Sequence, residues 1–421
     1  MLIKLSILFI LSIITPAYAY IDPATGNAFF TLAITIVSAI LFGLQYIYEH
    51  VFMVKGIFQK NKKRIPLLLY SEGNTYWPWF EPILEELENR KIHTQFYTSS
   101  QDDMCFNKDY KYIHPTFIGK GNKAYAKMAF VKADIVLMTT PGLDVYQLKR
   151  SKNVKKYVHF YHGLDDACGY RLFGTDYYDT LLIHNDINIK YIRELEVKRN
   201  LPPKEIVIVG DIRLDELNKR VSTLDTFIQK NTPKTILLAS SWGKEAVLYK
   251  YGSQIIDKLL ATDYHIIIRP HPQMRIDNPQ LLDELLEKYP NQERLEWDFK
   301  RDNLPSMQKS DVMISDFSGI IYEYSFIFNK PVITTTQEVN TEIYDISDLD
   351  EPTWEYELKG ALGAELNKDN IDNIKEILDK VIQEKNVDHI RSFAKKYWQN
   401  QNKCISSIID YIENSLKSPH K

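Results

Sequence analysis

Cysteine is scarce in this chain of 421 residues, which contains only Cys105, Cys168 and Cys404. The three lie far apart, their number is odd, and none has the spacing of a zinc ligand. A disulfide framework or a structural metal is therefore not expected, and a reducing compartment fits best. An excess of positive charge is also absent, because the net charge is −3. The composition therefore gives no reason to expect nucleic acid as a partner.

Charged residues are scarce over the first fifty positions. Residues 1–19 join an apolar stretch to Ala17-Tyr18-Ala19, the pattern of a signal-peptidase site. Residues 28–48 carry no charge, and about twenty helical residues span a bilayer. Basic residues from Lys55 to Arg64 follow, which by the positive-inside rule places the next part of the chain in the cytoplasm.

We therefore expect a signal segment at 1–19. Residues 20–64 are expected to hold a short external segment, one transmembrane helix at about 28–48 and a basic linker. The protein is expected to be a single-pass protein of the cytoplasmic (inner) membrane with its large domains facing the cytoplasm. If residues 1–19 are not cleaved, the two apolar segments form a hairpin and the orientation is the same. The alternative is that one of the segments is a buried helix of the globular part.

Short apolar runs alternate with amphipathic stretches from residue 65 onward, which predicts α/β architecture with doubly wound parallel sheets. Strands are expected at 65–70, 94–97, 135–139, 157–161, 180–184 and 206–209, then at 235–239, 265–269, 311–315 and 331–335. Helices are expected at 79–90, 245–260, 279–288, 319–328 and 389–416. Two such series predict two Rossmann-like domains, 65–230 and 231–421, with a cleft between them. Ligands of such sheets bind beyond the carboxyl ends of the strands.

The strongest single signal follows the predicted strand at 311–315. The sequence there breaks at Ser-Asp-Phe-Ser-Gly (315–319) and continues as a helix. This pattern directs hydroxyls, backbone N–H groups and the positive end of a helix dipole toward one place, which suits a phosphate or pyrophosphate. The alternative is an ordinary helix cap, because Ser and Asp are common in that position.

Other strand ends carry residues suited to chemistry. Residues 269–272 (Arg-Pro-His-Pro) follow a buried strand, and His162-Gly163 ends another, where a histidine faces the cleft and can act as a general base. Arg213 at a strand–helix corner could contact a phosphate or pair with Asp215. Ser241 could contribute to an anion site or lie in an ordinary capped turn, and Glu323 could reach a ribose hydroxyl pair or be a solvated helix residue. The basic loop 149–156 could bind anionic lipid headgroups or a phosphorylated acceptor, or could be a solvated face.

These corners, in this order, resemble the CDP-glycerol glycerophosphotransferase family of teichoic acid and related envelope polymer synthesis. The resemblance covers about residues 155–335 and rests on His162-Gly163, Gly210-x-x-Arg213-x-Asp215, Ser241-Trp242, the Arg-Pro-His-Pro turn and the Ser-Asp-Phe-Ser-Gly turn. It implies a GT-B-like fold and an enzyme that moves glycerol phosphate, or a related polyol phosphate, from a CDP-activated donor to an acceptor, releasing CMP. The acceptor would be a membrane lipid or a lipid-linked envelope glycan.

The resemblance also implies roles for individual residues. His162 would deprotonate the acceptor hydroxyl, and His271 is the second candidate catalytic residue. Arg269, His271, Ser315, Ser318 and Gly319 would hold the CDP pyrophosphate. The positions of the residues themselves add Arg213, Ser241 and Asp316 as candidate phosphate ligands and Glu323 as the candidate ribose ligand. No cofactor is expected, although Mg²⁺ could arrive bound to the substrate phosphates.

The chain departs from the family pattern beside its predicted base. Asp165 and Asp166 stand where the family usually has Thr-Pro and lysines. Two other classes of function therefore stay open. One is a GT-B glycosyltransferase or sugar-nucleotide epimerase that uses a nucleotide sugar. The other is a catalytically degenerate protein that binds nucleotide or acts as a scaffold.

Overall fold

The structure is a computed structural model that describes residues 63–164, 167–223, 234–335, 341–358, 360–384 and 386–417, together with positions 37 and 40. Its contacts divide the chain into residues 1–63 and 64–421, and both sheets lie in the second unit. The predicted signal segment, and all of the predicted membrane helix except positions 37 and 40, lie outside the described residues. Among the residues that are described, no helix has both the length and the apolarity needed to cross a membrane.

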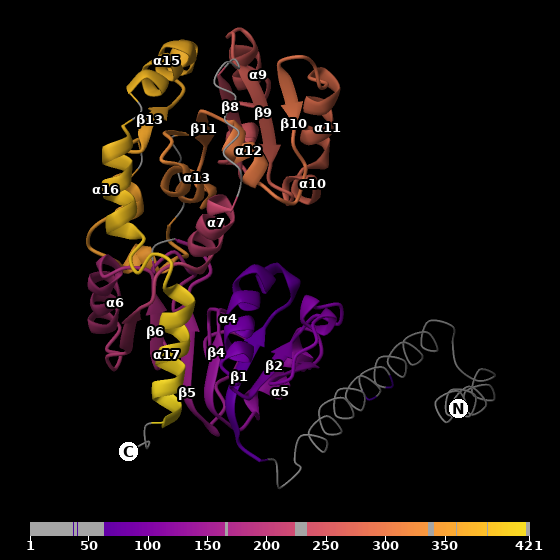
Figure 1. The fold of residues 1–421 in the computed structure, drawn as a ribbon, viewed down its shortest axis with the longest axis vertical. Helices are drawn as coiled ribbons and strands as arrows, with labels where there is room; N and C mark the ends of the chain where they lie inside the picture. Colours follow the sequence, from indigo (N-terminus) through magenta and orange to yellow (C-terminus); the bar gives the residue numbers. More distant parts are fainter. Residues whose placement is uncertain are drawn as a thin grey trace, which may run out of the picture. The chain divides into compact units, whose positions relative to one another are not determined.

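The first sheet is entirely parallel, with the strand order β3-β2-β1-β4-β5-β6-β7 (Figure 1). Its strands are β1 (Ile65–Ser71), β2 (Thr94–Thr98), β3 (Ile113–Phe117), β4 (Ala133–Met138), β5 (Val154–Phe160), β6 (Thr180–Ile183) and β7 (Glu205–Ile208). The first six follow the strand order typical of dinucleotide-binding folds. The direction of winding reverses between β1 and β4.

The second sheet repeats this topology with the order β10-β9-β8-β11-β12-β13, again entirely parallel. Its strands are β8 (Thr235–Ser240), β9 (His265–Pro270), β10 (Leu295–Trp297), β11 (Val312–Ser315), β12 (Val332–Thr335) and β13 (Gly363–Leu366). The predicted α/β class with two Rossmann-like parallel sheets is confirmed. The switch point lies between β8 and β11, which is where such sheets bind ligands.

Alternating side chains explain why these runs are central strands. On β1, Leu67 and Leu69 pack on one face of the sheet, while Leu68 and Tyr70 pack on the other. Because successive strand residues point to opposite faces, a strand covered on both sides must be apolar throughout. All ten predicted strands are present. Three strands were not predicted, β3, β10 and β13, and each lies at the edge of its sheet.

Helices cover both sheets (Figure 1). Those around the first are α4 (Trp77–Asn89), α5 (Asn122–Ala129), α6 (Ile187–Lys198) and α7 (Ile212–Ser222). Those that follow are α8 (Val247–Lys250), α9 (Gly252–Leu260), α10 (Met274–Asp277), α11 (Pro279–Lys288), α12 (Leu304–Lys309), α13 (Ile320–Phe328), α14 (Trp354–Leu358) and α15 (Ile374–Glu384). The single helix predicted at 245–260 is two helices, because Gly252 has φ 45° and interrupts it.

The predicted C-terminal helix is also divided, into α16 (Val387–Tyr397) and α17 (Cys404–Lys417). Asn400 and Asn402 between them adopt left-handed backbone conformations, with φ of 51° and 62°. The two helices belong to different cores. Ile390 and Tyr397 of α16 join the core that contains Leu237 of the second sheet, whereas α17 packs with β1 and α4 of the first sheet. The end of the chain therefore returns to the first sheet.

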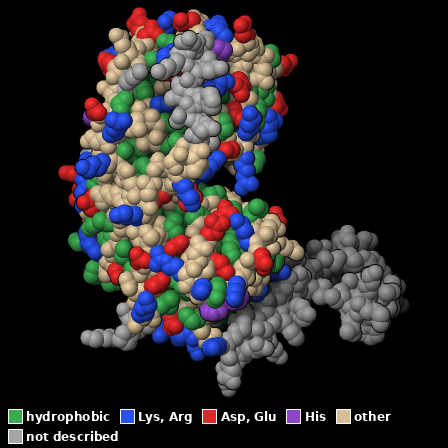
Figure 2. All heavy atoms as spheres, in the orientation of Figure 1, with side chains coloured by type: hydrophobic (Ala, Val, Ile, Leu, Met, Phe, Trp, Pro, Cys, Tyr) green, Lys and Arg blue, Asp and Glu red, His purple; other side chains and the backbone are tan. Residues whose placement is uncertain are grey.

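Charges of both signs are mixed over the face of the molecule shown in Figure 2, with Lys and Arg side chains next to Asp and Glu. Such a surface produces no broad field of one sign on that face. Recognition of a charged substrate there must come from groups at a particular site.

Candidate active site

A cavity of about 410 Å³ lies where the carboxyl ends of strands from both sheets meet the start of α13. It brings together seven of the ten predicted site residues: His162, Arg213, Arg269, His271, Ser318, Gly319 and Glu323. These residues come from four separate parts of the sequence. Their convergence in one cavity is what the carboxyl-end rule for parallel sheets leads us to expect.

His162 is held from one side of its ring. It follows β5, and its Nδ1 lies 2.8 Å from the hydroxyl of Thr139 and 3.2 Å from that of Tyr170. The rings of Tyr76 and Trp79 meet the imidazole edge-on, with centroids 5.1 and 5.8 Å away. These contacts fix the orientation of the ring, while Nε2 has no hydrogen-bond partner among the described residues.

Burial also sets the charge of His162. Removing the ring from water disfavours the imidazolium form, and this lowers the pKa of His162 to about 4. Among the described residues, no carboxylate accepts from Nδ1, and burial is the cause of the lowered pKa. His162 is therefore neutral at physiological pH, and Nε2 is a proton acceptor in the tautomer in which Nδ1 donates to Thr139 or Tyr170.

His271 is oriented in the opposite sense. Its backbone N–H donates to the carbonyl of Ser240 at 2.9 Å, which ties the turn after β9 to the end of β8. Nδ1 of His271 accepts the backbone N–H of Gln273 at 3.1 Å, so the proton of the neutral ring is on Nε2. Partial burial lowers the pKa of His271. His271 thus presents a hydrogen-bond donor, whereas His162 presents an acceptor when its proton is on Nδ1.

The start of α13 supplies unpaired backbone donors. Ser318, Gly319 and Ile320 all line the cavity. Within the described parts of the chain, their N–H groups have no acceptor, because the first bonds of this turn come from Ile321 and Tyr322. Free amides at the positive end of a helix form a binding site for an anion such as phosphate.

Three predicted phosphate ligands do not reach the cavity. Ser315 is fully buried and donates its hydroxyl to the carbonyl of Ala239 at 2.7 Å. Asp316 is also buried, and its Oδ2 accepts the backbone N–H groups of Ser241 and Val247, each at 2.9 Å. Burial raises the pKa of Asp316 to about 6. The Ser241 side chain is buried as well. These residues brace the loops beneath the cavity rather than lining it.

Arg213 and Glu323 form a closed group with Asn303. The Nε of Arg213 lies 3.1 Å from Oε1 of Glu323, while the amide of Asn303 donates to Oε2 at 3.0 Å. The alternative in which Arg213 pairs with Asp215 is wrong, because Asp215 accepts from the indole of Trp398 and from two backbone N–H groups. Glu323 therefore lies in the wall of the cavity with a fixed orientation.

The cations of the cavity differ in availability. Arg269 donates to the carboxylate of Asp298 at 2.5 Å and to the carbonyl of Lys300 at 2.6 Å, so its guanidinium is largely engaged. Arg301 also lines the cavity, is exposed, and makes no ion pair with any described residue. In the described ranges, no group of three or more His, Cys, Asp or Glu side chains could hold a metal ion.

Sequence reasoning missed Thr139, Tyr170, Asn303 and Arg301. Thr139 follows β4 directly, so the rule that ligands gather at carboxyl strand ends could have identified it. The others lie in loops and helix starts without a periodic or motif signal. Asp165 and Asp166, which depart from the family pattern, lie outside the described residues.

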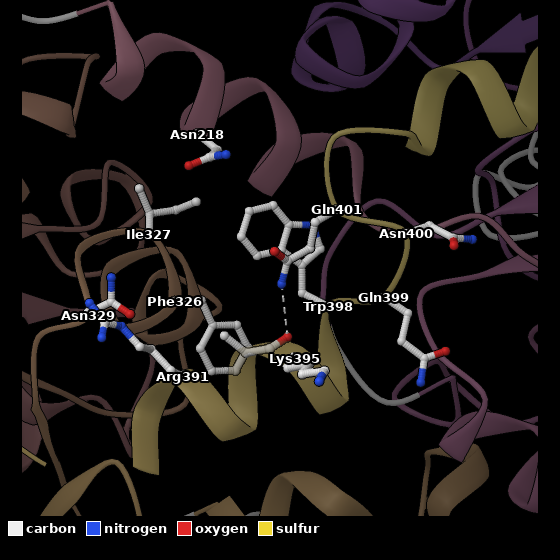
Figure 3. A pocket seen from close by; sticks show the side chains of 11 residues that line it. Asn218, Phe326, Ile327, Asn329, Arg391, Lys395, Trp398, Gln399, Asn400 and Gln401 are labelled. Atoms are coloured by element: carbon white, nitrogen blue, oxygen red, sulfur yellow. Dashed lines mark hydrogen bonds between the residues drawn. The ribbon is translucent and has the colours of Figure 1, made fainter. Parts of the chain in front are cut away.

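A second cavity of about 650 Å³ lies between α7, the end of α13 and α16 (Figure 3). None of the predicted site residues lines it.

The fold has relatives of known structure. The wall teichoic acid polymerase TagF superposes with a TM-score of 0.54 at 19% identity, over 92% of this chain and 97% of that one. UDP-GlcNAc 2-epimerases are also similar. The enzyme from Methanocaldococcus jannaschii has a TM-score of 0.52 at 15% identity, over 84% of this chain and 100% of the other. That from Neisseria meningitidis, bound to UDP-GlcNAc, has 0.51 at 16%, again over 84% and 100%. The chain therefore has a GT-B-like α/β fold.

The sequence identifies the family within this class. A model described as CDP-glycerol:poly(glycerophosphate) glycerophosphotransferase matches residues 200–413, just over half of the chain. The chain belongs to this family, and the resemblance inferred from the motifs is confirmed. It is a CDP-glycerol glycerophosphotransferase-like enzyme. The matched segment contains Arg213, His271 and the start of α13 but begins after His162. No curated protein matches the chain in sequence.

Proposed function

We propose that this enzyme transfers glycerol phosphate, or a related polyol phosphate, from a CDP-activated donor to an envelope glycan or lipid-linked acceptor and releases CMP. One observation carries the proposal. A neutral histidine oriented through Nδ1 and three backbone amides at the start of α13, which have no acceptor among the described residues, line the same cavity. The first feature suits a proton acceptor, and the second suits a phosphate.

His162 acts as the general base in this proposal. Its Nε2 takes the proton of the acceptor hydroxyl, and the oxygen attacks the phosphorus atom that carries the glycerol. The bond from that phosphorus to the bridging oxygen breaks, and its electron pair leaves with CMP. The amides at the start of α13, the Nε2–H of His271 and the guanidinium of Arg301 stabilise charge on the phosphates, which is the main task of a phosphoryl-transfer site.

The remaining predicted residues have supporting roles in the proposal. Glu323 keeps its assignment to the ribose, because its carboxylate lies in the cavity wall and is oriented by Arg213 and Asn303. Arg269 orients the turn that carries His271, since its guanidinium is bound to Asp298. Ser315, Asp316 and Ser241 are proposed to shape the phosphate site from below and not to touch the donor.

The experiment that tests the function is CMP release by the full chain in native membranes, with CDP-glycerol as donor and a membrane extract as acceptor. CDP-ribitol and UDP-sugars serve as alternative donors. We expect release with a CDP-polyol that depends on added acceptor. Turnover confined to UDP-sugars would favour the nucleotide-sugar alternative, and silence with every donor would favour a binding protein.

Membrane attachment belongs to the same proposal. It is supported by the charge-free stretch 28–48 and by the basic residues that follow it. We expect the chain to fractionate with membranes, and residues 64–421 to resist protease added outside intact spheroplasts. Cleavage of these residues under such conditions would contradict the proposed orientation.

The pH dependence of kcat/KM follows from the state of His162. The base must be unprotonated, and burial lowers its pKa to about 4. On acidification from pH 7, the neutral fraction therefore stays near one until the pH approaches 4. We expect the acid limb of kcat/KM, which reports groups of the free enzyme, to lie well below the ordinary histidine value of about 6.5. CMP release measured from pH 8 downward, with circular dichroism at each pH to verify folding, checks this. A midpoint near 6.5 would contradict it.

A further inference from the structure

The second cavity shares two helices with the candidate active site. On α13, Ile320 and Glu323 line the active-site cavity, and Ile327 lines the second one. Spacings of three and four residues place these side chains on one face of the helix. Seven residues separate Ile320 from Ile327, which is about 10 Å along the axis at 1.5 Å per residue. On α7, Leu214 and Asn218 are related in the same way. We call the second cavity the seam cavity, because it lies along the seam between α7 and α13.

The seam cavity lies where the chain returns to the first sheet. Residues 398–401 form one wall, between α16 and α17 (Figure 3). The side chain of Asn400 donates to the carbonyl of Ile208 at 2.7 Å, so this wall is tied to the end of β7. The backbone of this wall also packs closely against Gly210, where an added Cβ would come within 2.6 Å of the carbonyl oxygen of Gln399. The wall is thus built into the fold.

The lining carries positive charge that is not neutralised by neighbours. Lys395 and Arg391 lie four residues apart on α16, so they share one face of the helix. Lys395 makes no ion pair or hydrogen bond with a described residue. Arg391 lies 3.9 Å from Asp388, a fully exposed carboxylate, and a contact of this kind contributes little. None of the residues that line the seam cavity is acidic. These features suit an anion.

The other polar groups of the seam cavity are amides. Asn218, Asn329 and Gln399 contribute to the lining, together with the neighbours Asn400 and Gln401. Several of these groups already have partners: Asn218 donates to Asn402, Asn400 to Ile208 and Gln401 to Ala394, while both ends of the Gln399 amide contact Asp186. The amide of Asn329 and the carbonyl oxygens of Asn218, Asn400 and Gln401 have no partner among the described residues, and such groups match hydroxyls. A volume of about 650 Å³ lies within the range of small-ligand sites.

We propose that the seam cavity binds a phosphate-bearing polyol and that, during the reaction, it holds a segment of the acceptor. The two cations bind the phosphate, and the amides bind the hydroxyls. The acceptor role rests on the proposed function, because it requires the acceptor to extend from the active-site cavity along α13, over the rise of about 10 Å from Ile320 to Ile327. A short phosphodiester-linked polyol covers that distance. Free glycerol phosphate and a lipid headgroup share the same chemistry, and the experiment separates these sources.

The test measures binding to the full chain by titration calorimetry, without CDP-glycerol. The probes are a short oligo(glycerol phosphate), glycerol 3-phosphate and phosphatidylglycerol vesicles. We expect the oligomer to bind more tightly than glycerol 3-phosphate, and the R391A/K395A double variant to raise its Kd at least about tenfold. Lys396→Ala is the matched control, because Lys396 is on the same helix but does not line the seam cavity. It should change Kd less than twofold.

An unchanged Kd for the oligomer in the double variant would overturn the inference, as would an equal loss in Lys396→Ala. If vesicle binding depends on Lys395 and oligomer binding does not, the site binds lipid, and the acceptor role is contradicted. If the acceptor role holds, the double variant also raises KM for the acceptor and not KM for CDP-glycerol. Binding is measured without turnover. If no CMP is released but the oligomer still binds, the proposed function is therefore contradicted, whereas the binding site is still supported.

Discussion

His162→Ala lowers the rate of CMP release by about 10²–10⁴-fold, the range expected when a positioned general base is removed. The loss should appear in kcat, while the affinity for CDP-glycerol stays close to that of the parent enzyme, because the proposed phosphate site is on α13. Single-turnover assays combined with donor titration measure the two quantities separately. His93→Ala is the control, since His93 is an exposed histidine away from the cavity.

The size of this effect depends on the absence of a substitute base. Nδ1 of His271 is occupied by the N–H of Gln273, and Glu323 is held by Arg213 and Asn303. Asp211 is buried and accepts the N–H of Leu214 at the start of α7. Among the described residues that line the cavity, His162 is therefore the base with a free site.

His271→Ala provides a contrasting result. Because His271 presents a donor to the phosphates, its removal should weaken stabilisation of the transferring group by about 10²-fold or more. The pH midpoint set by His162 should remain in the residual activity.

A His162→Ala variant with near-normal turnover would show that another group takes the proton.

Arg199→Ala should lower the free energy of unfolding by about 3–5 kcal/mol, because it leaves buried charges without their partner. The guanidinium contacts Asp176, Asp345 and Asp348, each at 2.7 Å. Side-chain exposure is 8% for Arg199 and 1% for Asp345. Denaturant titration measures the loss. Arg220→Ala is the control, because its pair with Asp302 is exposed at both ends and should contribute less than about 1 kcal/mol.

The loss caused by Arg199→Ala should shrink at lower pH. Burial raises the pKa of Asp345 to about 6 even with Arg199 present, and removing the cation raises it further. Below the folded-state pKa and above the unfolded value of 3.8, the folded state binds the extra proton, so its stability rises as the pH falls. We expect a smaller difference between variant and parent at pH 5 than at pH 7. An equal difference at both would show that Asp345 is not the group left uncompensated.

This network also supports the candidate active site. Asp345 accepts the backbone N–H of Phe173 at 2.6 Å, and its own N–H donates to the carbonyl of Tyr170 at 2.8 Å. Tyr170 in turn contacts Nδ1 of His162. Arg199→Ala should therefore reduce activity as well as stability.

Much of the fold could be predicted because central strands of parallel sheets are buried on both faces. Such strands must be continuous apolar runs, and the runs at β1, β8 and β11 have that form. The three missed strands are edge strands, which need less apolar surface. β3 contains a proline, β10 has three residues, and β13 reads Gly-Ala-Glu-Leu.

The site was predictable to the extent that it depends on strand ends. His162, His271 and Gly319 each follow a predicted strand, and the structure brings them to one cavity. Ser315 and Asp316 satisfied the same pattern, but they brace loops, because serine and aspartate bind backbone groups as readily as they bind a ligand.

Contacts between segments that lie far apart in the sequence could not be predicted from the pattern of apolar residues. The contact of Thr139 with His162 joins residues that follow neighbouring strands, β4 and β5, and the return of α17 to the first sheet follows a break at Asn400 and Asn402. Neither leaves a periodic signal in the sequence.

The most direct test of phosphoryl transfer is to identify which bond of CDP-glycerol breaks. The full chain is given a donor labelled both in the glycerol and in its attached phosphate, together with acceptor. If glycerol phosphate is transferred, both labels reach the acceptor in equal amounts and unlabelled CMP is released, with neither product formed by His162→Ala. Transfer of the glycerol label alone, with the labelled phosphate retained in CDP, would contradict the account.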